Sequence, residues 1–130
     1  MIFILEDNYE RIENFKIALG TIESHIERTV PEAIEWLSNN DKRISLFSLD
    51  NDLYMPEYDG DEGEGWELCE WLILNTSKRP LLIHTTNISA ATKMEMACAD
   101  AGWHCLRVPP YNGFEWIHQS WIDAIREFIC

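Results

Sequence analysis

Residues 44–52 read ISLFSLDND, a short apolar run that ends abruptly in two aspartates around an asparagine. Three other apolar runs also end in polar residues: IFIL runs into Glu6-Asp7, PLLI into His84, and WHCL into Arg107. Between these runs lie segments with helical spacing of apolar residues, so short strands and helices alternate along the whole chain. This order predicts an α/β fold with a parallel sheet covered on both faces.

The periodicity predicts five strands and five helices in one domain over residues 1–130. The strands are expected near 2–5, 24–29, 44–49, 80–83 and 103–106, and the helices near 8–19, 31–39, 65–75, 90–101 and 117–128. We expect a flavodoxin-like (βα)5 three-layer sandwich with sheet order 2-1-3-4-5. In that order the four strands with polar ends are neighbours, and the second strand, which ends in Thr29-Val30-Pro31, lies at the edge.

Ligands of open α/β sheets bind outside the carboxyl ends of the strands, so the polar ends are expected to form one site. Carboxylates are the hard oxygen ligands that Mg²⁺ (or Mn²⁺) prefers. Arginine, hydroxyl and amide groups bind phosphate, and a histidine exchanges protons near neutral pH. The candidates are Glu6, Asp7, Asp50 and Asp52 for the metal, Thr85, Thr86, Asn87 and Arg107 for phosphate, and Asp50 and His84 for catalysis.

The aspartate register remains open from the sequence. The apolar run ends at Asp50, which favours this residue as the carboxylate at the strand end. Side chains two apart on a strand point the same way, so Asp52 reaches the same site if the strand extends that far.

These residues resemble a known family. Two acids after the first strand, an aspartate after the third, a hydroxyl after the fourth and a cation near proline after the fifth are similar to the CheY-like receiver domain of response regulators. The segment DLYMPEYDG, residues 52–60, follows the receiver pattern D-x-x-M-P-x-x-D-G. The segments ILEDNYERIENF, LDND and HTTN more specifically resemble the receiver-like family that is predicted to process cyclic phosphates.

The resemblance implies a pocket that binds or hydrolyses a small ligand that contains phosphate, such as a cyclic nucleotide, with a metal-dependent cyclic phosphodiesterase as the candidate enzyme. It equally leaves open a stand-alone receiver or pseudo-receiver that signals through a protein partner, with or without aspartyl phosphorylation. The chain departs from both patterns, because Asn51 stands where the narrower family usually has histidine and Arg107 stands where receivers have lysine. Arginine holds phosphate as a planar fork but is not a proton donor.

Each candidate also has a purely structural interpretation. The Glu6-Asp7 pair could be a helix cap with a solvated neighbour, His84 a hydrogen-bonded core histidine, and Arg107 a partner of a nearby surface acid. The acidic stretch over residues 57–64 lacks the spacing of an EF-hand, so we expect a solvated, mobile loop that could cover the site.

The composition excludes several other classes of function. With a formal net charge of −13, the chain repels nucleic-acid backbones, so duplex nucleic acid is not an expected partner. The N-terminal run is too short for a signal peptide or a membrane span, and no membrane association is expected. Reduced, buried thiols are expected for Cys69, Cys98, Cys105 and Cys130, which lack CxxC spacing, and a cytoplasmic location is therefore predicted.

Overall fold

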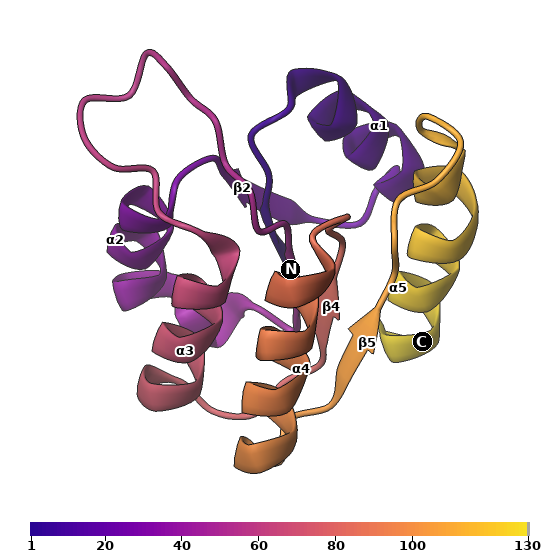
Figure 1. Cartoon of the computed structure of the whole chain (residues 1–130). Coiled ribbons are helices and arrows are strands. Elements are labelled where there is room, and N and C mark those ends of the chain that lie inside the picture. The colour runs from indigo at the N-terminus through magenta and orange to yellow at the C-terminus, as the bar shows by residue number, and fades with distance from the viewer. Residues whose placement is uncertain (130) are drawn as a thin grey trace.

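The computed structural model describes residues 1–129 and contains one five-stranded parallel sheet in the order β2-β1-β3-β4-β5 (Figure 1). The strands are β1 (Ile2–Leu5), β2 (Ser24–Glu27), β3 (Leu46–Leu49), β4 (Leu81–Ile83) and β5 (Cys105–Arg107). The predicted order of strands is confirmed. The third and fifth strands begin two residues later than the apolar runs, because Ile44 and Trp103 pack into the core from the connections before them.

The five helices are α1 (Tyr9–Leu19), α2 (Val30–Asn40), α3 (Gly65–Asn75), α4 (Ile88–Ala101) and α5 (Ile122–Ile129). A 3-10 turn, η1 (Asp41–Arg43), follows α2, and a π-helical segment, η2 (Ile117–Trp121), leads into α5. Asn8 caps α1 by accepting a hydrogen bond from Arg11 N at 3.0 Å, as an N-cap asparagine does. This cap fixes where the first turn of α1 begins, directly beside the end of β1.

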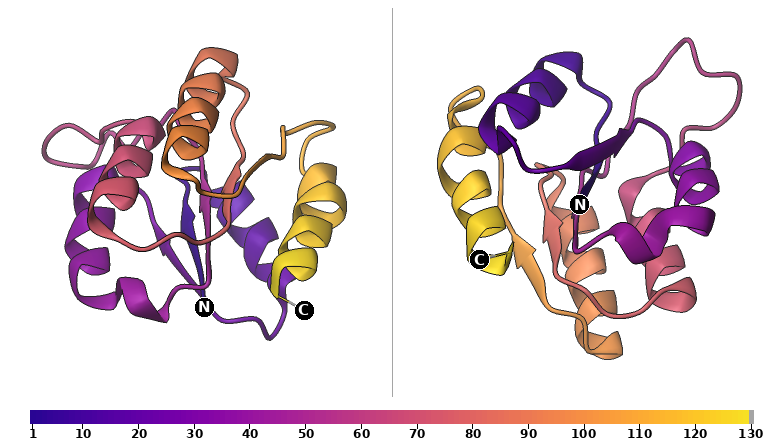
Figure 2. Two further views of the ribbon diagram at one scale, coloured as in Figure 1. Left: turned by 90° about the horizontal axis from the view of Figure 1, so that it is seen from below. Right: turned by 180° about the vertical axis from the view of Figure 1, so that it is seen from behind.

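The sheet separates two hydrophobic cores. Helices α2, α3 and α4 cover one face, where Phe3, Leu5 and Leu49 are buried, and α1, η2 and α5 cover the other, where Ile2, Ile4 and Leu46 are buried (Figure 2). Strand residues therefore alternate between the two faces. This alternation decides the direction of every side chain near the ends of the strands.

Cys69 and Cys98 are buried with free thiols, and Cys105 is half-buried with a free thiol. Cys130, which the sequence also predicted to be buried, lies outside the described residues. Across residues 1–129, no helix combines the length and the apolar character that crossing a bilayer requires.

Candidate functional site

Glu6, Asp50 and His84 lie at one level, one residue beyond the ends of three neighbouring strands. Their backbone N–H groups continue the parallel ladder: Glu6 N donates to Glu27 O at 3.1 Å, Asp50 N to Leu5 O at 3.0 Å, and His84 N to Leu49 O at 2.9 Å. The fifth strand contributes Val108 at this level, because Val108 N donates to Ile83 O. All four residues are one position past residues that face α2–α4, so their side chains point to the side of α1 and α5.

Three carboxylates meet at this edge. One oxygen each of Glu6, Asp7 and Asp50 lies within 4.8 Å of the other two. Glu6 is fully buried and Asp50 is 5% exposed. Burial is the main cause that raises the pKa of Glu6 to about 7, and burial followed by the charge of Glu6 raises the pKa of Asp50 to about 7.

This donor set fits a divalent metal ion. The three carboxylates offer hard oxygen ligands, and a divalent cation would compensate the burial that raises the pKa of Glu6 and Asp50. The backbone fixes two of them: Asn8 N donates to Glu6 at 3.1 Å and Asn51 N to Asp50 at 2.8 Å.

His84 is fully buried directly behind the carboxylates. Its Nε2 lies 3.1 Å from Glu6 Oε1 and its Nδ1 lies 2.7 Å from Ser48 Oγ, which accepts a hydrogen bond from Trp121 Nε1 at 2.9 Å. Because Trp121 only donates, all partners are satisfied when the Ser48 hydroxyl donates to Nδ1 and the Nε2–H donates to Glu6. Burial lowers the pKa of His84 to about 4, so the imidazole is neutral at pH 7. His84 therefore reaches the surface of the site only through Glu6.

Asp52 lies outside the carboxylate cluster. The chain turns at Asn51, whose buried side chain accepts a hydrogen bond from Trp66 N at 3.1 Å, so the strand does not continue to Asp52. The exposed Asp52 instead accepts hydrogen bonds from the amides of Asn51 at 2.9 Å and Asn87 at 3.1 Å.

The threonines after β4 differ in exposure. Thr85 is buried, and its hydroxyl accepts from Asn87 N at 3.1 Å, whereas Thr86 is exposed. Asn87 caps α4 by accepting from Ala90 N at 3.0 Å. This cap and the amide contact with Asp52 are the side-chain hydrogen bonds that the structure shows for Asn87. The predicted phosphate-binding role of these residues stays a prediction.

Arg107 is in register with Ile83 and therefore points to the opposite face of the sheet. Its guanidinium contacts Thr92 and Glu95 on α4. Another arginine, Arg11 in the first turn of α1, lies beside the acids, with Nη1 3.6 Å from Glu6 and 3.8 Å from Asp50. The position of Arg11 beside the acids was not predicted from the sequence. The alternation of strand residues, however, could have shown that Arg107 does not lie on the face of Glu6 and Asp50.

The acidic loop between β3 and α3 is exposed at many positions but anchored at several points. Tyr54 N donates to Asp7 Oδ2 at 2.7 Å, Val30 N to Glu62 O at 2.7 Å, and Arg28 pairs with Glu57 at 2.9 Å. Arg28 also donates to Asp7 O, so this one arginine binds both the loop and the chain at the acidic edge. The loop therefore contacts the acidic edge through Asp7, and its predicted role as a cover of the site stays a prediction.

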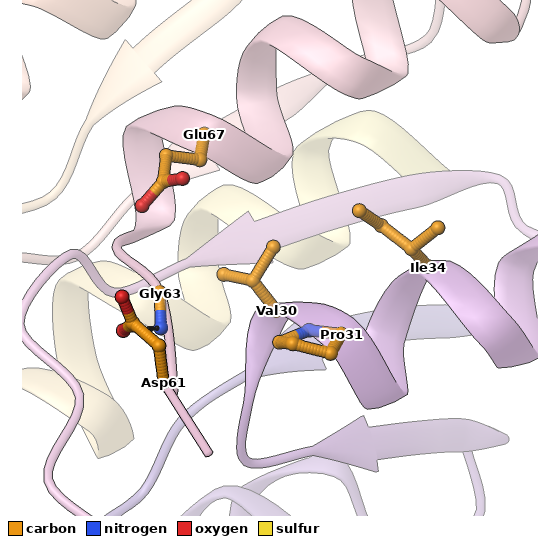
Figure 3. Close-up of a pocket in the computed structure, with 6 residues that line it drawn as sticks. All are labelled: Val30, Pro31, Ile34, Asp61, Gly63 and Glu67. Carbon is orange, nitrogen blue, oxygen red and sulfur yellow. Dashed lines mark hydrogen bonds between the residues drawn. The ribbon is translucent and has the colours of Figure 1, made fainter.

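A hollow of about 500 Å³ lies under this loop, away from the carboxylate cluster. Its apolar wall is Val30, Pro31 and Ile34 at the start of α2, and Asp61 and Glu67 lie across from it (Figure 3).

Comparison with known structures agrees with this architecture. A CheY-like response regulator receiver domain from Methanospirillum hungatei JF-1 is 20% identical, with a TM-score of 0.72, covering 97% of this chain and 90% of its own. The Mn²⁺-bound form of the response regulator Rcp1 is 18% identical, with a TM-score of 0.68 and coverage of 98% and 91%. The receiver domain of HemR from Leptospira biflexa is 21% identical, with a TM-score of 0.68 and coverage of 99% and 94%. The search of curated proteins finds no match.

The sheet order, the covering helices and the acids at the carboxyl edge define a CheY-like receiver fold with a cluster able to hold a metal ion. Residues 2–100 match the model of the cyclic-phosphate processing receiver domain. The chain belongs to this family.

Proposed function

We propose that the carboxyl edge of the sheet binds a divalent metal ion, Mg²⁺ or Mn²⁺, together with a cyclic phosphate or cyclic nucleotide, and that it opens the phosphate ring by hydrolysis. The observation that carries this proposal is the meeting of Glu6, Asp7 and Asp50 within 4.8 Å, two of them buried. Buried carboxylates that repel each other lower the stability of the fold unless a bound cation compensates their charge. Membership of the cyclic-phosphate processing family supports the choice of ligand.

In the proposed reaction, a water oxygen forms a bond to phosphorus, one ester P–O bond of the ring breaks, and the leaving oxygen takes a proton. A bound divalent ion supplies Lewis-acid polarisation of the phosphoryl group. Glu6, Asp7 and Asp50 would hold this ion through their ionised carboxylates, and the attacking water would supply the proton that the leaving oxygen takes. His84 holds Glu6 by its Nε2–H, and its predicted role as a proton carrier stays a prediction.

The alternative function is a receiver or pseudo-receiver that signals through a protein partner. The observation that favours it is the D-x-x-M-P-x-x-D-G segment, whose first residue, Asp52, is exposed to solvent. Stable modification of Asp50 or Asp52 by acetyl phosphate, detected by mass spectrometry of the intact protein, would support this alternative.

The main proposal is tested with the purified protein, Mg²⁺ or Mn²⁺, and a panel of cyclic mononucleotides, cyclic dinucleotides and terminal 2′,3′-cyclic phosphates. Binding is followed by calorimetry and ring opening by ³¹P NMR. We expect metal-dependent binding that Asp50→Asn weakens at least tenfold, because even loss of a group that only orients a metal ligand typically costs about 10–100-fold in affinity. The absence of binding to every member of the panel, or binding unchanged by Asp50→Asn, would refute the proposal.

A further inference from the structure

Among the described arginines that pair with an acid, Arg11 differs because its guanidinium makes no hydrogen bond. Within residues 1–129, its guanidinium makes two long ion pairs, 3.6 Å to Glu6 and 3.8 Å to Asp50, and no side-chain hydrogen bond. Arg28 and Arg107, in contrast, both donate to fixed oxygens. A guanidinium has five N–H donors, so Arg11 keeps its capacity to donate to an anion.

The position of Arg11 is nevertheless fixed. Its backbone N–H donates to the Asn8 side chain at the start of α1, and its guanidinium lies over the ring of Trp116, 5.5 Å from the centroid. The side chain is 23% exposed, so part of it is open to solvent. A stacked arginine of this kind keeps its place at the rim when its ionic partners change.

The fifth strand places no cation on the side of the sheet where the carboxylates of Glu6 and Asp50 lie. Val108, which is buried, occupies the level of Glu6 and Asp50, and Arg107 faces α4. The positive charge that a phosphate needs beside the metal is therefore available from the first turn of α1.

We infer that Arg11 is an exchangeable counter-ion. It offsets part of the negative charge of Glu6 and Asp50 when no metal is bound, and it binds the phosphate of the ligand once a divalent cation is bound to these carboxylates. This inference rests on the proposed function and assigns a residue to its phosphate subsite. Two cations compete for the same oxygens, so Arg11 opposes binding of the metal. An anion and Arg11 attract each other, so Arg11 favours binding of the phosphate.

The test is a pair of titrations on the wild type and Arg11→Gln at pH 8.5, above the pKa of about 7 of Glu6 and Asp50. The first follows Mn²⁺ by electron paramagnetic resonance, and the second follows methyl phosphate by calorimetry at saturating Mg²⁺. We expect Arg11→Gln to bind Mn²⁺ at least roughly fivefold more tightly, since two unit charges about 4 Å apart in a water-like dielectric interact by that factor and Mn²⁺ carries two charges. We expect its affinity for methyl phosphate to fall roughly tenfold or more.

Arg126→Gln is the matched control, since it removes one positive charge from an exposed position on α5. It should leave both affinities within twofold of the wild type. Arg11→Lys keeps the charge but loses the planar fork, so we expect wild-type affinity for Mn²⁺ and intermediate affinity for methyl phosphate. This variant also keeps the test valid if Arg11→Gln does not fold.

The titrations separate the role of Arg11 from the proposed function. If the wild type binds Mn²⁺ and methyl phosphate but Arg11→Gln binds both like the wild type, the role of Arg11 is wrong and the proposed function stands. Loss of methyl phosphate binding in Arg107→Gln instead of Arg11→Gln would also overturn the inference and return the role to Arg107. If the wild type binds neither probe, the proposed function fails as well.

Discussion

Replacing Asp50 by asparagine should make the metal-free protein more stable at pH 8. Asp50 is 5% exposed, and its pKa is raised from 3.8 to about 7 by burial and by the charge of Glu6. At pH 8 the folded protein must hold this carboxyl ionised against both effects. Asparagine has nearly the same shape and is always neutral, and its Oδ1 can still accept the hydrogen bond from Asn51 N.

The size of the gain follows from the pKa. Each pH unit between the folded and unfolded pKa corresponds to about 1.4 kcal/mol, so the difference between 3.8 and about 7 sets an upper value of about 4 kcal/mol at pH 8. The attraction between Asp50 and Arg11, 3.8 Å away, is already part of this balance. The gain should shrink toward zero at pH 4, where the wild-type carboxyl is protonated in the folded state and about half protonated in the unfolded state.

The assay is urea unfolding with EDTA at pH 8 and at pH 5, followed by circular dichroism. At pH 8 the midpoint of Asp50→Asn should rise by roughly 2 M urea for a slope typical of this size. Asp52→Asn, two residues away and exposed, is the control and should change stability by less than about 0.5 kcal/mol. A midpoint at pH 8 equal to or below that of the wild type, or an equal gain at both pH values, would refute the reasoning.

Three further outcomes are expected. Without metal, the free energy of unfolding of the wild type should fall by up to roughly 3 kcal/mol between pH 6 and pH 8. Glu6 and Asp50 have a pKa of about 7 in the folded state and of 4.5 and 3.8 in the unfolded state, so stability falls as both lose their protons. Saturating Mg²⁺ should remove this loss in the same urea assay. Ser48→Ala leaves Trp121 Nε1 without its acceptor and should cost about 1–3 kcal/mol, measured by urea unfolding, with weaker Mn²⁺ binding measured by calorimetry. Gly65→Ala would place a Cβ 1.9 Å from Asp50 O, so it should lower the melting temperature and weaken Mn²⁺ binding, whereas an unchanged melting temperature would contradict this close packing.

The fold could be predicted from the sequence because local signals agreed with each other. The helix over residues 65–75 matches its prediction, because neighbouring residues in the sequence indicate both its apolar face and the turn before it. The sheet order needed one more step: alternation and right-handed crossovers allow several orders, and the flavodoxin-like one makes the four strands with polar ends neighbours. The split of the last helix into η2 and α5 was not predicted, because a π-helical turn changes the hydrogen bonds but leaves the apolar periodicity readable.

The site was predicted in part. Glu6, Asp7, Asp50 and His84 meet because each follows a strand, which the sequence shows directly. The choice between Asp50 and Asp52 depends on where the chain turns, and that is decided by the distant contact of Asn51 with Trp66. Arg11 was missed for a similar reason, because the direction of a helix side chain depends on how the helix packs against the sheet.

The arrangement of charges at the carboxyl edge argues for a ligand more strongly than the acids alone do. A structural ion pair in a protein interior is usually completed by hydrogen bonds, because unpaired buried charge is costly. Here the guanidinium of Arg11 stays 3.6 Å and 3.8 Å from Glu6 and Asp50, too far for hydrogen bonds, while burial keeps the pKa of both acids near 7. Backbone contacts and His84 hold the carboxylates by hydrogen bonds, whereas Arg11 makes none to them. Acids that are held rigidly beside a cation without hydrogen bonds to it cost stability. The same arrangement suits the proposed binding of a metal ion and then of a phosphate.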